Sequence, residues 1–142
     1  ERPARDVVLE HLLQVLLIEA LRSATDTSGM PGLMRGLADE RLAQPLRAIH
    51  AEPHRAWNVA ELARSAGLSR SAFFTRFSEV VGMAPMEYLQ SWRMTLARHM
   101  LRSRQHSIAK VAMKVGYGST SAFSSAFSRR MGVSPARYAR AE

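Results

Sequence analysis

The sequence from Ser107 to Gly132, "SIAKVAMKVGYGSTSAFSSAFSRRMG", carries the strongest indication of the fold. Phe123 and Phe127 stand four residues apart, a spacing that places both on one buried stripe of a helix. The other faces of that helix carry serines, although Ser is only a middling helix former and a solvated face would favour Glu, Lys or Gln. The pattern therefore raises the question of what the serine-bearing face contacts.

The capping residues and the glycine of this stretch predict two short helices joined by a sharp turn. Ser107 can cap a first helix whose apolar residues follow helical spacing, and Gly116 supplies the left-handed turn that ends it. Ser119 can cap a second helix that runs to about Met131, before Gly132. A helix, a glycine turn and a second helix form the spacing of a helix-turn-helix unit.

A similar sequence pattern occurs about fifty residues earlier, from about residue 58 to residue 82. Asn58 and Glu61 have capping-box spacing, and Gly67 ends that first helix. A second helix is expected from Ser69 to about Val81. Eight of eighteen positions are identical between residues 71–88 and 121–138, which indicates an internal repeat. One such match is weak evidence, but two copies in one chain are much stronger.

The remaining segments also favour helices, so we predict an all-α fold. Pro85 suits the first position of a helix, and apolar spacing then continues over residues 86–102, about 25 Å at 1.5 Å per residue. This long helix joins the two units. Upstream, we predict a helix from Asp6 to about Arg22, a loop over residues 23–32, and a helix from a cap at about Asp39 to His50.

The charge of the chain points to a polyanionic partner. The net charge is +8, and residues 88–141 contain no Asp or Glu. The chain contains no cysteine, which excludes disulfides and fits a reducing compartment. The longest apolar stretch, within residues 7–21, is interrupted by charged and polar residues, so we expect neither a membrane span nor a signal peptide.

The serine-bearing faces fit contact with nucleic acid. Opposite Phe73 and Phe77, the stripe consists of Ser71, Phe74, Thr75 and Ser78; opposite Phe123 and Phe127, it consists of Ser121, Ser124, Ser125 and Ser128. A helix in a DNA groove cannot carry carboxylates there, because they would repel phosphates, whereas hydroxyls bond to base edges and phosphates. The alternative without a nucleic-acid ligand is that these small residues lie on a solvated face or at a helix–helix contact.

Residues 37–138 resemble the DNA-binding region of AraC/XylS-type transcriptional regulators, most specifically in "IAKVAMKVGYGSTSAFSSAFSRRMGVSPARY". The resemblance implies seven helices, with two helix-turn-helix units that read adjacent major-groove segments. It also implies that residues 1–36 are the last helix and the linker of an upstream regulatory or dimerisation domain, and that residues 37–142 are the DNA-binding domain.

The resemblance also implies which residues contact DNA. Base contacts are expected from Ser71, Phe74 and Thr75, and from Thr120, Ser121 and Ser125. Family members often have arginine where Thr75 and Ser125 stand, so this chain lacks the usual guanine reader there. Phe74 could instead touch a thymine methyl group. The complete candidate DNA-binding set is Ser69, Arg70, Ser71, Phe74, Thr75, Arg76, Ser119, Thr120, Ser121, Ser124, Ser125, Arg129 and Arg130.

The two alternative classes of function are an enzyme and a helical RNA-binding or protein-interaction module. For an enzyme, His50 and His54 have a four-residue spacing, but Pro53 breaks the helix that would align them and no third metal ligand is evident. The serines lie in no nucleophile elbow, and "GYGST" lacks the lysine of a phosphate loop. We therefore expect no enzymatic activity, metal or cofactor. A helical RNA-binding or protein-interaction module is the remaining alternative.

The expected partners follow from this interpretation. They are double-stranded DNA and, if the regulator activates transcription, RNA polymerase. The apolar residues of the helix over residues 6–22 cover well over half of its circumference, which fits pairing with a second copy of the chain, packing against an upstream sensor domain, or burial on residues 37–142. The expected location is the cytoplasm, at the nucleoid.

Overall fold

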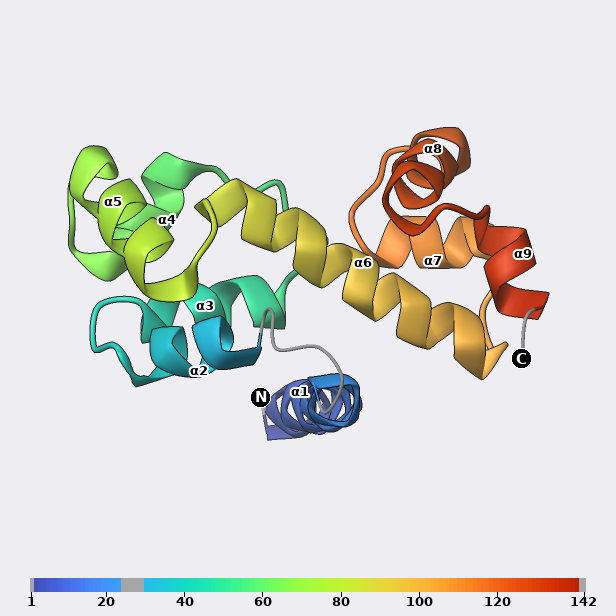
Figure 1. Cartoon of the computed structure of the whole chain (residues 1–142), viewed down its shortest axis with the longest axis horizontal. Coiled ribbons are helices and arrows are strands. Elements are labelled where there is room, and N and C mark those ends of the chain that lie inside the picture. Colours follow the sequence, from blue (N-terminus) through green and yellow to red (C-terminus); the bar gives the residue numbers. More distant parts are fainter. Residues whose placement is uncertain (1, 24–29, 141–142) are drawn as a thin grey trace. The chain divides into compact units, whose positions relative to one another are not determined.

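The computed structural model of the protein describes the backbone of residues 2–23 and 30–140 and the side chains of residues 6–17 and 32–140. Within these residues the fold is all-α, as predicted, and contains no strand (Figure 1). The helices are α1 (Arg2–Ser23), α2 (Met30–Ala38), α3 (Ala43–Ala51), α4 (Val59–Ala66), α5 (Arg70–Val81), α6 (Pro85–Ser103), α7 (Ile108–Lys114), α8 (Thr120–Met131) and α9 (Pro135–Arg140).

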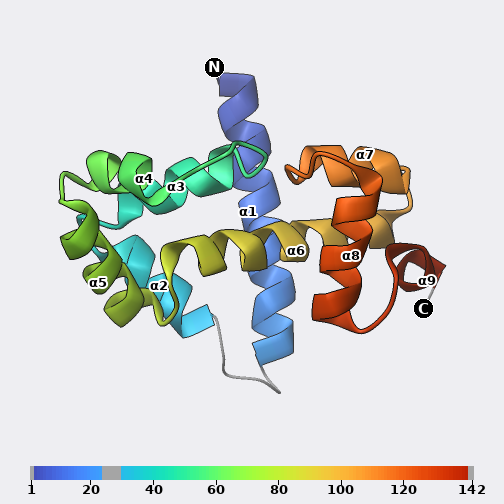
Figure 2. The same cartoon turned by 90° about the horizontal axis from the view of Figure 1, so that it is seen from above.

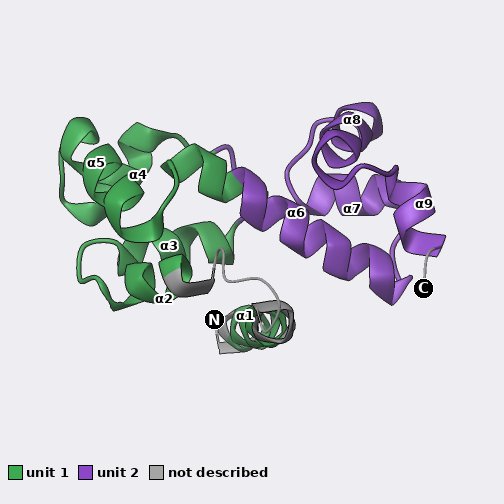
Figure 3. Cartoon of the chain, viewed as in Figure 1, with its two compact units in different colours: residues 1–52, 57–89 green, residues 53–56, 90–142 purple. Residues whose placement is uncertain are grey.

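The chain packs as two units (Figure 3). Unit 1 comprises residues 1–52 and 57–89, and unit 2 comprises residues 53–56 and 90–142. In unit 1, α4 and α5 lie side by side in both views (Figures 1 and 2), and α2 packs against α5. The core of this unit includes Phe73 and Phe77, whose ring centroids are 5.6 Å apart, and Tyr88, whose ring meets Phe77 edge-on.

Unit 2 repeats this arrangement with α7 and α8. Phe123 and Phe127 are fully buried, their centroids again 5.6 Å apart, and Tyr138 meets Phe127 edge-on. Buried Arg93 on α6 donates hydrogen bonds to the carbonyl oxygens of Pro53 and Arg55, which ties the short segment 53–56 to this unit. The buried phenylalanine pairs agree with the stripes predicted from the four-residue spacing.

The predicted caps of both helix-turn-helix units are confirmed. Each of four helices begins with a side-chain oxygen that accepts a hydrogen bond from a backbone N–H three residues on, and the capping residues are Asn58, Ser69, Ser107 and Ser119. The glycine turns that follow α4 and α7 have positive φ, 70° at Gly67 and 94° at Gly116. These local interactions explain why the ends of the helices in both helix-turn-helix units could be predicted closely.

The predictions were less accurate before residue 58. The loop expected over residues 23–32 is wrong at its end, because Met30–Gly32 form the first turn of α2. Gly32, the last residue of the expected loop, and Gly36 permit close packing: a Cβ on Gly32 would collide with the carbonyl of Val81, and one on Gly36 would lie 2.6 Å from Leu46. The domain boundary between residues 36 and 37 stays a prediction, and α2 runs across it.

Asp39 caps a turn and not a helix. Its carboxylate accepts hydrogen bonds from the amides of Arg41 and Leu42, and α3 begins only at Ala43. The helix expected from Asp39 to His50 is therefore four residues shorter at its start. From α3 to α9, seven helices begin within the stretch of residues 37–138, which is the number that the resemblance implies.

The described part of α1 has one buried and several exposed apolar residues. Val15 is 1% exposed, whereas Leu9, Leu13 and Leu17 are 50%, 66% and 63% exposed. The apolar surface of α1 is thus only partly covered by the chain itself. In the described part of the chain, no helix has the length and apolar character that a membrane crossing needs.

Candidate nucleic-acid interface

The first candidate surface is the face of α5 that points away from its buried phenylalanines. Ser69 caps the helix, its Oγ accepting from the amide of Ala72 at 3.1 Å. Arg70, Ser71, Phe74 and Thr75 are all exposed, and Phe74 keeps 47% of its surface accessible although it is a large aromatic residue. The predicted face is therefore presented outward, beside an open hollow lined in part by Ser69, Ser71 and Thr75.

Arg76 differs from the other candidates on α5 because its guanidinium is already paired. The Nε of Arg76 lies 3.2 Å from Oδ1 and 3.1 Å from Oδ2 of Asp39, and Nη2 lies 3.1 Å from Oδ2. Partial burial alone would raise the pKa of Asp39, but the amides of Arg41 and Leu42 and the Arg76 guanidinium together hold that pKa below its usual value. In this structure the guanidinium of Arg76 therefore faces Asp39 while its side chain remains partly exposed.

The second candidate surface is the matching face of α8. Ser119 caps the helix with an Oγ that accepts from the amide of Ala122 at 3.0 Å. Thr120, Ser121 and Ser125 are exposed, whereas Ser124 is half-buried and lies at the edge of the face. No carboxylate lies on α8, and its last turn carries Arg129 and Arg130, both exposed.

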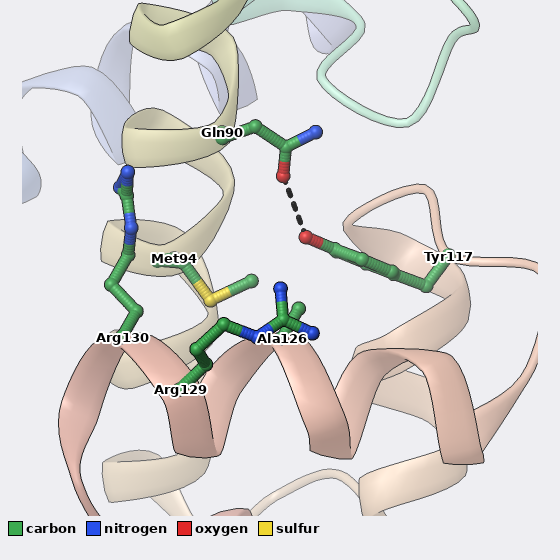
Figure 4. Close-up of a pocket in the computed structure, with 6 residues that line it drawn as sticks. All are labelled: Gln90, Met94, Tyr117, Ala126, Arg129 and Arg130. Atoms are coloured by element: carbon green, nitrogen blue, oxygen red, sulfur yellow. Dashed lines mark hydrogen bonds between the residues drawn. The ribbon is translucent and has the colours of Figure 1, made fainter.

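A pocket lies between α6 and α8, and both helix segments belong to unit 2 (Figure 4). It is lined by Gln90, Met94, Tyr117, Ala126, Arg129 and Arg130, and its volume is about 360 Å³. The hydroxyl of Tyr117 donates a hydrogen bond of 2.7 Å to Oε1 of Gln90. Burial raises the pKa of Tyr117, although the nearby guanidiniums of Arg93, Arg130 and Arg129 act to lower it.

Sequence reasoning missed Gln90 and Tyr117. The sequence indicates a connecting helix over residues 86–102 and a turn at Gly116, and neither feature assigns a role to Gln90 or Tyr117. Gln90 is one of several polar residues on that helix, so its type does not indicate which side chain it meets.

The candidate metal pair does not form a site. Among the described residues, no group of three or more His, Asp or Glu side chains could hold a metal ion. His50 is buried, and its Nε2 is 2.5 Å from the hydroxyl of Tyr88. Burial lowers the pKa of His50 to about 4, so its imidazole is neutral at pH 7. His50 belongs to unit 1 and His54 to unit 2.

Comparison with known proteins places the chain in a family. A family described as a helix-turn-helix domain matches residues 62–141. A putative AraC-like transcription regulator of Streptomyces lividans is 41% identical over 137 residues, which are 95% of this chain and 45% of that protein. The chain belongs to the AraC-type helix-turn-helix family.

Further relatives agree with this AraC-type assignment. The transcriptional regulator AlkR of Acinetobacter baylyi is 39% identical over 96% of this chain and 45% of its own length. Among solved structures, the DNA-binding domain of AdpA in complex with a target DNA aligns with a TM-score of 0.66 and 32% identity, over 71% of this chain and 91% of that one. The chain spans about 45% of the length of these curated relatives.

Proposed function

We propose that this AraC-type chain binds double-stranded DNA in a sequence-specific manner as part of a transcriptional regulator. The observation that carries the proposal is the repeated geometry of α5 and α8. Each helix is capped by a serine, buries a phenylalanine pair and exposes the opposite face, rich in small hydroxyl residues. Each would enter the major groove as the second helix of its unit, so that the site has two half-elements about 10 bp apart.

The exposed residues divide into two roles. Ser71, Thr75, Thr120, Ser121 and Ser125 would hydrogen-bond base edges, and Phe74 would contact a thymine methyl group. Arg70, Arg129 and Arg130 would bind phosphates, together with the hydroxyls of Ser69 and Ser119, which fixes the register of the two helices. Arg76 would serve chiefly to hold Asp39. We assign these contacts to a DNA-binding domain that spans residues 37–142.

Selection of bound sequences from random duplexes tests this function. The affinity for the selected duplex would then be measured by fluorescence anisotropy at several salt concentrations, with a scrambled duplex and a duplex RNA of the same sequence as competitors. For about six to eight phosphate contacts, the slope of log K against log salt should be about −5 to −7. Equal affinity for scrambled DNA, a flat salt dependence, or preference for the RNA would each refute the proposal.

Residues 1–36 would then belong to an upstream regulatory or dimerisation domain, and α1 would pair with α1 of a second copy. The support is the exposure of Leu9, Leu13 and Leu17, which follow one another every four residues. Analytical ultracentrifugation of the chain and of a Leu13→Glu/Leu17→Glu variant tests this pairing. A parent chain that stays monomeric at high concentration would refute it. We further propose that the regulator acts at the nucleoid in the cytoplasm, and that RNA polymerase is a partner if it activates transcription.

A further inference from the structure

The lining of the pocket between α6 and α8, hereafter the Gln90 pocket, includes two arginines and no acidic residue. Arg129 and Arg130 both line the pocket, and in Figure 4 the Arg130 side chain rises from α8 beside α6, whereas the Arg129 side chain extends along α8 toward the side of Tyr117. Apart from Glu142, which lies outside the described residues, unit 2 contains no Asp or Glu at all. The two guanidiniums thus have no carboxylate in the described part of their own unit. An anion in this pocket would supply the missing counter-charge.

The neutral side chains of the Gln90 pocket, Gln90 and Tyr117, are also arranged so that hydrogen-bond donors remain for an acceptor. Since the Tyr117 hydroxyl donates to Oε1 of Gln90, it holds the amide in one orientation and leaves the two N–H groups of that amide as donors. Tyr117 is itself fixed, because its ring packs edge-on against Phe123 with a centroid separation of 5.6 Å. The amide orientation is therefore determined by the core of the unit.

The size and the lining of the pocket indicate more than a bare oxyanion. Its volume of about 360 Å³ equals roughly twelve water molecules at about 30 Å³ each, which is several times what one tetrahedral anion displaces. One part of the lining is apolar, formed by the Met94 side chain, which is 2% exposed, and by Ala126. A phosphate joined to a sugar matches this combination, because the sugar has an apolar face and the phosphate has charged oxygens.

We propose that the Gln90 pocket binds one phosphodiester of the DNA backbone, which rests on the DNA-binding function proposed above. Arg129, Arg130 and the Gln90 amide would bind the phosphate oxygens, and the adjacent deoxyribose would lie against Met94 and Ala126. Tyr117 is a positioning residue that acts through Gln90. Because the pocket lies on the flank of α8, the phosphate would be one that borders the groove read by Ser121 and Ser125.

A methylphosphonate scan of the selected duplex tests the proposal directly, since each substitution removes the charge of a single linkage. In the parent chain, we expect one linkage whose neutralisation weakens binding about tenfold or more, as for loss of a charge-assisted hydrogen bond. In the double variant Arg129→Ala/Arg130→Ala, neutralising that same linkage should cost less than about twofold, because both charged donors are gone. In Gln90→Ala, which keeps both guanidiniums, the cost should stay above that level. Arg130→Ala should also reduce the salt slope by about 0.9. The matched controls are Arg137→Ala and Gln105→Ala, exposed residues outside the pocket, which should retain the full sensitivity.

The role of Tyr117 has a separate readout. Tyr117→Phe should weaken binding several-fold in the parent chain, without changing the salt slope, and should have no further effect in the Gln90→Ala background. A merely structural role would give the same loss in both backgrounds. Thermal melts by circular dichroism would show that each variant remains folded.

Three results would overturn the inference. The first is a linkage sensitivity that persists in full in Arg129→Ala/Arg130→Ala. The second is binding of inorganic phosphate that shifts the NMR signals of the Gln90 amide and is not displaced by the duplex, which would indicate a site for a free anion. The third is a parent chain that selects no duplex, and in that case the proposed function fails as well. Specific binding with no pocket-dependent linkage would refute the phosphodiester site alone.

Discussion

Replacing Ser121 by Glu should separate DNA binding from stability. Ser121 is exposed and is the second residue of α8, two positions after the Ser119 cap. A carboxylate in the first turn interacts favourably with the helix dipole, by about 0.3–1 kcal/mol. Glu is also a better helix former than Ser. The free energy of unfolding should therefore stay constant or increase slightly.

The effect on DNA binding should have the opposite sign. If Ser121 faces the groove, the new carboxylate lies about 5 Å from a phosphate, and at an effective dielectric constant of about 20–80 the repulsion is about 1–3 kcal/mol. The affinity for the selected duplex should fall about five- to two-hundred-fold, and less at high salt because the repulsion is screened. Fluorescence anisotropy would measure the affinity, and circular dichroism melts would measure stability.

The control for this experiment is Gln105→Glu, which adds the same charge at an exposed position after α6. This variant should bind DNA with nearly the parent affinity. Binding by Ser121→Glu at the level of Gln105→Glu would show that the α8 face does not meet DNA. A large loss of stability in Ser121→Glu would show that the face assignment itself is wrong.

Three further outcomes are expected. Phe123→Ala, which truncates a fully buried ring, should lower the free energy of unfolding by about 3–5 kcal/mol in urea denaturation. Asp39→Asn keeps an oxygen for the turn but releases Arg76, so binding to all duplexes should tighten and the salt slope should steepen by about 0.9; an unchanged slope would contradict this. The pKa of His50 is about 4 in the folded state and about 6.5 in the unfolded chain, so the unfolded chain binds more protons between these pH values. The urea concentration at the unfolding midpoint should therefore fall as the pH is lowered from 6.5 toward 4. His50→Gln should make this midpoint depend less on pH.

The elements that could be predicted from sequence are those determined by nearby residues. Each helix-turn-helix unit has its capping serine or asparagine three residues from the amide that it accepts, and its glycine at the turn itself. The phenylalanine pairs lie one helical turn apart, so their shared burial also follows from local spacing. The same reasoning placed the exposed hydroxyl faces of α5 and α8.

The elements that could not be predicted depend on residues far apart in sequence. The helix α2 has two glycines that disfavour a helix locally, yet they are needed where its backbone approaches Val81 and Leu46. Asp39 reaches Arg76 across 37 positions, and Tyr117 reaches Gln90 across 27. No periodicity relates such pairs, so the sequence could show their chemical types but not their contacts.

These long-range contacts also explain why two similar repeats should not act alike. In unit 1 an acidic side chain from the turn before α3 neutralises Arg76, and the exposed face of α5 offers the apolar Phe74. The described part of unit 2 contains no Asp or Glu that could neutralise Arg129 and Arg130, and the exposed face of α8 offers hydroxyl groups and these arginines but no large apolar side chain. Apolar contact with a base discriminates among sequences, whereas phosphate binding adds affinity for every sequence. Unit 1 should therefore contribute more of the discrimination and unit 2 more of the salt-dependent affinity, which is why the slope should steepen in Asp39→Asn and flatten in Arg130→Ala.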